Sequence, residues 1–153
     1  MNIFVLDIDV HRCAEAHNDK HVVKMVTESA QLLSSAVRLS GIDAGYKLTH
    51  KNHPCAIWTR ESLSNWHWLC ILAGALNDEY KYRYNKLVNH KAYDVITSLP
   101  TPALPDIGPT PFRLAMPDKY KGDDPVIAYR NYYMGEKRHI AQWRNRPIPA
   151  WWE

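Results

Sequence analysis

The sequence contains few cysteines, few glycines and no long apolar run. Its three cysteines, Cys13, Cys55 and Cys70, form neither a CxxC pair nor the spacing of a disulfide scaffold, so we expect reduced thiols. The opening stretch MNIFVLDID has no basic segment before its apolar residues, and Asp7 and Asp9 end it early, which argues against a signal peptide or a membrane span. We therefore expect a cytoplasmic protein with no membrane partner.

Length and composition suit one ordinary globular domain. We expect residues 1–153 to form a single domain, because a hydrophobic content of 46% is enough for a core in a chain of 153 residues. A net charge of +3 with eight further histidines is compatible with an anionic partner but does not require one. The protein is expected to be a monomer or a small homo-oligomer.

The longest helical pattern lies near the N-terminus. Residues 10–39 contain neither glycine nor proline, and their apolar residues recur every three or four positions, which predicts one long helix. Asp9 is expected to cap this helix and Gly41 to end it. Residues 3–6 are apolar in a row, which predicts either a short strand or a buried extended arm.

Further helices are expected from residue 54 to about residue 87, over residues 91–98, and from residue 125 to about residue 143. Seven prolines and two glycines between residues 99 and 125 predict a long irregular segment that packs onto the domain. The predicted fold class is therefore mainly α: a compact single-domain helical bundle with a short N-terminal extended segment and a long Pro-rich loop.

Four polar residues share one face of the first predicted helix. His17, His21, Lys24 and Glu28 are spaced four, three and four residues apart. The row borders the apolar face, where burial and neighbouring charges shift the pKa of such groups toward acid–base catalysis. The alternative is a solvated helix face with a pair between Lys24 and Glu28, although Lys before Glu is the less favourable order.

A second group of candidate residues precedes the helix predicted from residue 54, in the segment THKNHP. His50, Asn52 and His53, with Arg60 just downstream, are predicted to hold a phosphate at the start of that helix. No cofactor is expected, but neutral imidazoles would also suit zinc or another divalent metal. The alternative metal ligands are His17, His21, His50 and His53.

Basic and aromatic residues alternate in EYKYRYNK and again in the closing QWRNRPIPAWWE. Such a pattern is typical of proteins that contact the nucleic-acid backbone and stack on bases. Arg144 and Trp151 are the predicted DNA contacts of the tail, and Lys20 that of the first helix. Alternatively, Trp151 and Trp152 pack as part of the core or as a lid.

The order of three segments resembles the pyrimidine-dimer DNA glycosylases, the small all-helical endonuclease V type of phages and bacteria. The segments are HNDKHVVKMVTESAQLL, HPCAIWTRESLSNWHWLCILAGALNDEYKYRY and QWRNRPIPAWW, spread over much of the chain. The resemblance implies a DNA repair enzyme, in the host cytoplasm if a phage encodes it. It also implies that an N-terminal α-amine attacks C1′ of a damaged nucleotide and forms a Schiff base, while a glutamate of the first long helix moves protons.

The chain departs from that family at two positions. The family exposes its amine by removing the initiator methionine before a small residue, whereas Asn2 usually leaves Met1 in place. In the nearest register Lys24 stands where the glutamate is expected, and Glu28 follows one turn later. Either Lys24 or the amine of Met1 would then be the nucleophile, with Glu28 as acid–base group and His21 as a helper.

The leading hypothesis is a DNA-acting N-glycosylase or glycosylase/AP lyase for damaged or modified pyrimidines. One alternative is a metal-dependent hydrolase or transferase that acts on nucleotides or nucleic acid through the four histidines. Another is a non-catalytic DNA-binding module that uses the basic aromatic tail. All three predict DNA or a nucleotide as partner. The predicted substrate contacts are His17, Lys20, His50, Asn52, His53, Arg60, Arg144 and Trp151.

Overall fold

The computed structural model describes all residues from 1 to 153 and contains helices but no strands. The helices are α1 (Val10–Ala16), α2 (Asp19–Leu39), α3 (Pro54–Glu61), α4 (Leu63–Arg83), α5 (Lys91–Ser98) and α6 (Pro125–Glu136), with single 3-10 turns η1 (Asp118–Tyr120) and η2 (Arg138–Ile140). The prediction of a mainly α fold is confirmed. None of these helices combines the length and apolarity that a bilayer crossing requires.

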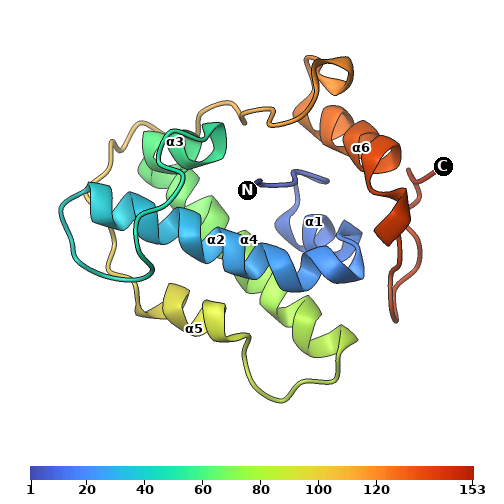
Figure 1. Ribbon diagram of the computed structural model, residues 1–153, viewed down its shortest axis with the longest axis horizontal. Helices are drawn as coiled ribbons and strands as arrows, with labels where there is room; N and C mark the ends of the chain where they lie inside the picture. Colours follow the sequence, from blue (N-terminus) through green and yellow to red (C-terminus); the bar gives the residue numbers. More distant parts are fainter.

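Helices α2 and α4 cross at the centre of the molecule, and the shorter helices surround them (Figure 1). The apolar residues that recur along both helices meet in this crossing: Val22, Val26 and Leu33 of α2 and Leu69 and Leu76 of α4 have no exposed surface. Helix α1 packs on α4, α3 and α5 pack on α2, and α6 lies near α1 at one side of the bundle (Figure 1). One hydrophobic core therefore holds the fold together.

The helix predicted over residues 10–39 is two helices, because the chain breaks at His17 and Asn18. The side chain of Asn18 caps α2 by accepting a hydrogen bond of 2.9 Å from the backbone N–H of His21. Arg83 donates to the backbone carbonyls of His17 at 2.7 Å and Glu15 at 2.9 Å, which satisfies the end of α1. His17 therefore leaves the row, and only His21, Lys24 and Glu28 share a face of α2.

Two further helix predictions were too long. The pattern from residue 54 breaks at Ser62, whose hydroxyl accepts from the backbone N–H of Asn65 at 3.1 Å and caps α4, and that helix ends at Arg83. The pattern from residue 125 ends at Glu136, followed by η2. At Ser62 a polar capping residue separates the two helices although neither a glycine nor a proline marks the break.

Two segments without regular structure close over the helices. Residues 2–6 are buried and extended without strand pairing, so the arm is the correct one of the two alternatives. The Pro-rich segment packs onto the domain as predicted, since Phe112 stacks on Trp58 with ring centroids 5.0 Å apart and contacts Trp68 edge-on at 4.9 Å. The arm and this segment together bring residue 2 beside residue 115.

Arg83 joins α4 to the break between α1 and α2. Its side chain is fully buried and pairs with Glu79 at 2.8 Å and with Asp19 at 3.1 Å. We expect Arg83→Met to lower the free energy of unfolding by about 3–5 kcal/mol, because the substitution leaves buried acceptors without their partner. Urea denaturation measures the change, with Lys86→Ala, an exposed residue without an ion pair, as control. A loss below about 1 kcal/mol would show that the network is not needed for the fold.

Candidate active site

The amino terminus lies against the carboxylate of Glu28. The Met1 nitrogen is 3.3 Å from Oε1 of Glu28, and the backbone N–H of Asn2 donates to the same oxygen at 3.0 Å. Glu28 itself is buried, at 8% exposure. The side chain of Met1 is 5% exposed while the residue as a whole is half-buried, so solvent reaches its backbone rather than its side chain. The amine is thus held on a buried carboxylate, in a residue that is half-buried as a whole.

The side chain of Asn2 anchors this arrangement. Its Nδ2 donates to the carbonyl of Ala115 at 2.9 Å, while its Oδ1 accepts from the backbone N–H of Ile3 at 2.8 Å and from the thiol of Cys55 at 3.5 Å. Asn2 is 8% exposed. A buried amide whose partners lie in three segments fixes the backbone on which the amine sits. No local sequence pattern marks Asn2 as part of the site, since its main partners, Ala115 and Cys55, are far away in sequence.

Lys24 and His53 flank the amine and Glu28. Lys24 Nζ is 3.7 Å from Oε2 of Glu28, so the carboxylate bridges two cations, but the Lys24 side chain is 65% exposed. Burial, then the positive amino terminus and then His50, lower the pKa of His53, which places His53 within the field of the site. The Nδ1 of His53 accepts from the backbone N–H of Cys55 at 3.0 Å and caps α3. The structure therefore brings Met1 and Lys24 to Glu28, with His53 near enough for the charge of the amino terminus to act on it.

The other two histidines of the predicted row are internal. Nδ1 of His17 lies 2.7 Å from the carbonyl of Cys13, and Nδ1 of His21 lies 2.7 Å from the hydroxyl of Tyr133. Burial lowers the pKa of His17 to about 4, and the pKa of His21 to about 3 with neighbouring positive groups adding to the shift. Since His17 is 1% exposed, the structure removes it from the predicted substrate contacts.

The remaining predicted contacts are spread over the surface. Lys20, Asn52 and Arg144 are exposed. The guanidinium of Arg60 already makes a hydrogen bond within the protein, because it donates to the carbonyl of Lys51 at 2.6 Å. Trp151 is half-buried.

Three aromatic or cationic contacts hold Trp151: the guanidinium of Arg130 lies 5.3 Å from its ring centroid, and Tyr133 and Trp152 lie beside it. Trp151 therefore packs against protein side chains, as in the alternative of a core or lid role, and its contact with DNA stays a prediction.

The four histidines of the alternative metal site do not form a ligand group. No cluster of three or more His, Cys, Asp or Glu side chains has the arrangement that a metal ion needs. His17, His21 and His53 also use their Nδ1 atoms in hydrogen bonds within the protein. The residues present therefore do not fit the zinc site considered from the sequence.

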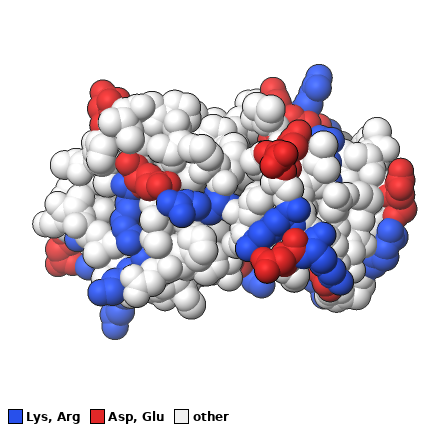
Figure 2. All heavy atoms as spheres, turned by 90° about the horizontal axis from the view of Figure 1, so that it is seen from above, with Lys and Arg blue, Asp and Glu red and all other residues white.

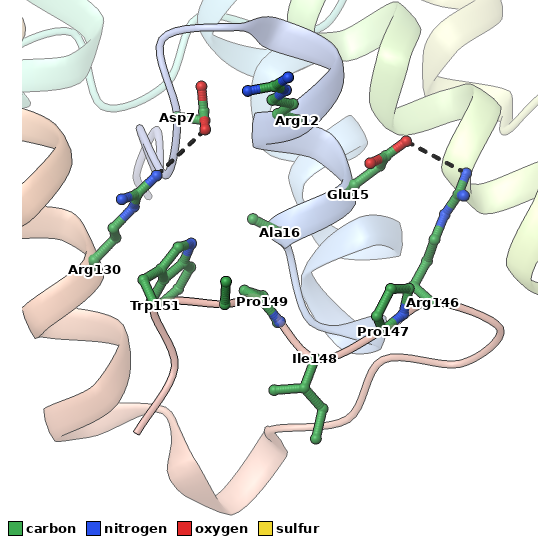
Figure 3. A pocket seen from close by; sticks show the side chains of 11 residues that line it. Asp7, Arg12, Glu15, Ala16, Arg130, Arg146, Pro147, Ile148, Pro149 and Trp151 are labelled. Carbon is green, nitrogen blue, oxygen red and sulfur yellow. Dashed lines mark hydrogen bonds and ion pairs between the residues drawn. The ribbon is translucent and has the colours of Figure 1, made fainter.

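Two hollows of the surface lie away from the amine. One, of about 510 Å³, lies between α1 and the C-terminal tail, where Arg130 pairs with Asp7 and Arg146 with Glu15 (Figure 3). The other, of about 630 Å³, is lined by Lys20 and Arg144, among other residues. In the first hollow Arg130 and Arg146 are thus paired with carboxylates and Arg12 is not, while the second offers two cations without an ion pair.

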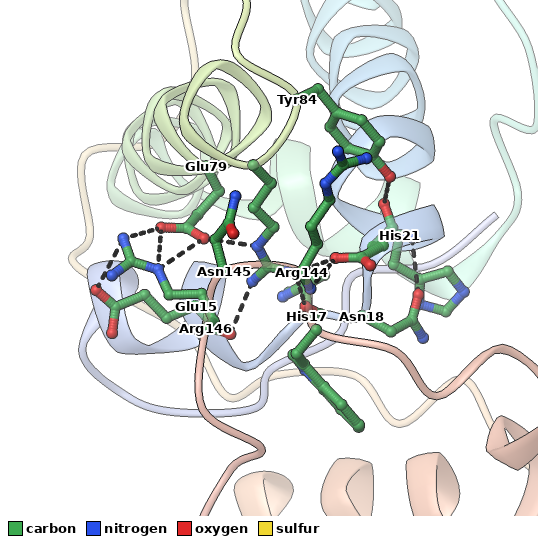
Figure 4. A network of polar contacts seen from close by, with 12 residues as sticks. Glu15, His17, Asn18, His21, Glu79, Tyr84, Arg144, Asn145 and Arg146 are labelled. Carbon is green, nitrogen blue, oxygen red and sulfur yellow. Dashed lines mark hydrogen bonds and ion pairs between the residues drawn. The ribbon is translucent and has the colours of Figure 1, made fainter.

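A buried polar network separates these hollows. Glu79 accepts from Arg83 at 2.8 Å and from Arg146 at 2.6 Å, and Asp19 accepts from the backbone N–H of Arg144 at 2.8 Å (Figure 4). His17 lies within this group, whereas the ring of His21 lies at its edge, turned away from the arginines (Figure 4). The network is structural, since its charges are paired with one another.

No family model matches the chain, and comparisons with curated proteins and with solved structures found no match. The geometry of the amine and Glu28 is therefore the main indication of function.

The buried histidines predict a loss of stability in acid. Both are neutral in the folded protein and take up protons on unfolding, so their contribution is fully present above pH 6.5 and falls as the pH drops toward the folded pKa of about 4 for His17 and about 3 for His21. We expect the free energy of unfolding to fall by about 3 kcal/mol per pH unit between roughly pH 6 and pH 4.5. Denaturation at several pH values measures this slope. His17→Gln should remove the contribution of one of the two protons and so reduce the slope by about half. An unchanged slope would contradict the lowered pKa of His17.

Proposed function

We propose that the protein is a DNA glycosylase, or glycosylase/AP lyase, that uses the α-amine of Met1 as its nucleophile. The observation that carries the proposal is the distance of 3.3 Å between this amine and the buried carboxylate of Glu28. Amine nucleophiles form Schiff bases at carbonyl-level carbons, and a carboxylate within hydrogen-bond reach removes and returns their protons.

The geometry favours Met1 over Lys24. An α-amine is as a class more often neutral at pH 7 than a lysine amine, and only the neutral form attacks. Lys24 is mostly exposed, so it lacks the burial that activates lysine nucleophiles. Lys24 instead supplies positive charge next to the site, which attracts a phosphate backbone.

The proposed reaction begins with attack on C1′ of the nucleotide. A bond forms between the amine nitrogen and C1′, and the bond from C1′ to the base breaks, its electron pair leaving with the base. The surplus proton of the amine passes to Glu28 and from there to O4′ as the C1′–O4′ bond opens, which yields the imine. Glu28 is then ready to accept the next proton.

Only the charged groups near α2, and not the surface as a whole, support a DNA substrate. On the face seen in Figure 2, Lys and Arg side chains are interspersed with Asp and Glu, so that face is not a broad basic surface. Positive groups without a carboxylate partner instead lie around the first half of α2, among them Lys20, Lys137 and Arg144. A small group of cations of this kind suits a bound DNA strand that bends toward the amine.

Borohydride trapping tests the proposal. Incubation with duplex DNA that carries an abasic site or a damaged pyrimidine, followed by borohydride, should leave a covalent adduct that denaturing electrophoresis resolves. Mass spectrometry of the digested adduct should place the DNA on residue 1. If the protein binds DNA tightly and yet no adduct forms with any lesion at low salt, the non-catalytic binding module is the better description.

A further inference from the structure

His21 carries a hydrogen-bond donor that the protein does not use. The hydroxyl of Tyr133, which is fully buried, accepts from the backbone N–H of Asn18 at 3.2 Å and lies 2.7 Å from Nδ1 of His21. If Nδ1 carried the proton, the hydroxyl proton of Tyr133 would have no acceptor in the core. Tyr133 therefore donates to Nδ1, and the proton of the neutral ring is on Nε2.

The ring is also fixed in place. Phe4 stacks on it with centroids 4.6 Å apart and planes at 22°. Nε2 makes no hydrogen bond within the protein, and the ring edge turns away from the neighbouring network (Figure 4). His21 keeps 4% of its surface exposed. The Nε2–H group thus has no acceptor within the protein and can donate a hydrogen bond to an external one.

Cations from separate elements surround this donor. Lys24 follows His21 by one turn of α2, and Lys137, just after α6, lies 6.0 Å from the ring centroid of Phe4 and 5.2 Å from that of Tyr132. Burial is the main cause of the lowered pKa of His21, and nearby positive groups that include Lys137 and Lys24 add to it.

The acidic groups on the same two helices have other partners. Glu28 binds the amino terminus, and Glu136 accepts from Tyr120 at 3.0 Å and pairs with Lys119 at 3.6 Å. Lys24 shares Glu28 with the amino terminus, whereas Lys137 has no carboxylate partner. A neutral N–H donor beside these cations is suited to an anion with several acceptor oxygens.

We propose that His21, Lys24 and Lys137 form a binding site for a phosphodiester group of the DNA strand. His21 and Glu28 lie seven residues apart on α2, which corresponds to about 10 Å along one face of the helix. This spacing is compatible with a phosphate next to the reacting nucleotide. The inference rests on the proposed function for the identity of the ligand, and it gives His21, predicted as a helper in catalysis, the role of a hydrogen-bond donor to a phosphate.

Nitrogen NMR of the whole protein tests the tautomer directly. At pH 7 the His21 ring should show a protonated Nε2 and an unprotonated Nδ1. The Nε2 resonance should shift on addition of dimethyl phosphate and of an oligonucleotide with a stable abasic analogue, but not on addition of chloride at equal ionic strength. A proton on Nδ1, or no shift with either probe, overturns the proposal. A shift with dimethyl phosphate but not with DNA also overturns it, because the site then takes a small phosphate ester and not the DNA strand.

Affinity for the abasic-analogue DNA gives a second measurement, which does not require catalysis and is made on protein with a blocked amino terminus. His21→Phe keeps the stacked ring but removes the donor, and should weaken binding about tenfold, whereas His21→Gln should stay within about threefold. Lys137→Ala should reduce the slope of log affinity against log salt by about one, and Lys86→Ala should not. If His21→Phe does not fold, an unchanged slope for Lys137→Ala overturns the proposal on its own. Intact binding with failed trapping would instead refute only the glycosylase.

Discussion

Blocking the amino terminus is expected to abolish the borohydride-trapped adduct. An uncleaved N-terminal extension converts the Met1 amine into an amide, which has no lone pair available for attack on C1′. The same extension at the C-terminus should leave the adduct yield unchanged. Lys24→Ala should retain adduct formation, slowed by weaker DNA binding.

The reverse pattern has an equally clear meaning. If the N-terminally extended protein still forms the adduct and Lys24→Ala does not, Lys24 is the nucleophile. Both amines contact Glu28, Met1 through Oε1 at 3.3 Å and Lys24 through Oε2 at 3.7 Å, so the carboxylate would keep its role.

Glu28→Gln is expected to lower the rate of adduct formation by about a hundredfold to ten-thousandfold, the range found when an acid–base group is removed. Glutamine keeps the size and an acceptor for the backbone N–H of Asn2, so circular dichroism should show a folded protein. Glu61→Gln is a matched control, because Glu61 is also a helical glutamate in an ion pair, with Arg113 at 2.9 Å, but is not in contact with the amine. Single-turnover trapping measures both variants. Equal rates for Glu28→Gln and the wild type would remove Glu28 from the mechanism.

The helices were predictable where apolar periodicity acts alone. The bounds of α5, Lys91–Ser98, agree with the prediction, and so does the start of α6 at Pro125. The breaks at Asn18 and Ser62 were not predicted, because asparagine and serine are also found within helices. What stabilises the first break is Arg83, which is far away in sequence and reaches the end of α1 only in the folded protein.

The candidate site was predictable in part. The spacing of Lys24 and Glu28 placed both on one face, and the resemblance suggested the amine of Met1. Neither could show that Glu28, rather than Lys24, meets the amine. That contact depends on Asn2, which is anchored to Ala115, a residue 113 positions later. Long-range polar contacts of this kind leave no local pattern in a sequence.

The double contact made by Oε1 of Glu28 has a consequence for maturation of the chain. The nitrogen atoms of residues 1 and 2 lie 3.3 and 3.0 Å from the same oxygen. If an aminopeptidase removes the initiator methionine, the newly freed amine of Asn2 is already next to the same carboxylate. Both proteoforms would then carry a primary amine next to Glu28. A mixture of the two from an expression host would contain different first residues but the same reactive group.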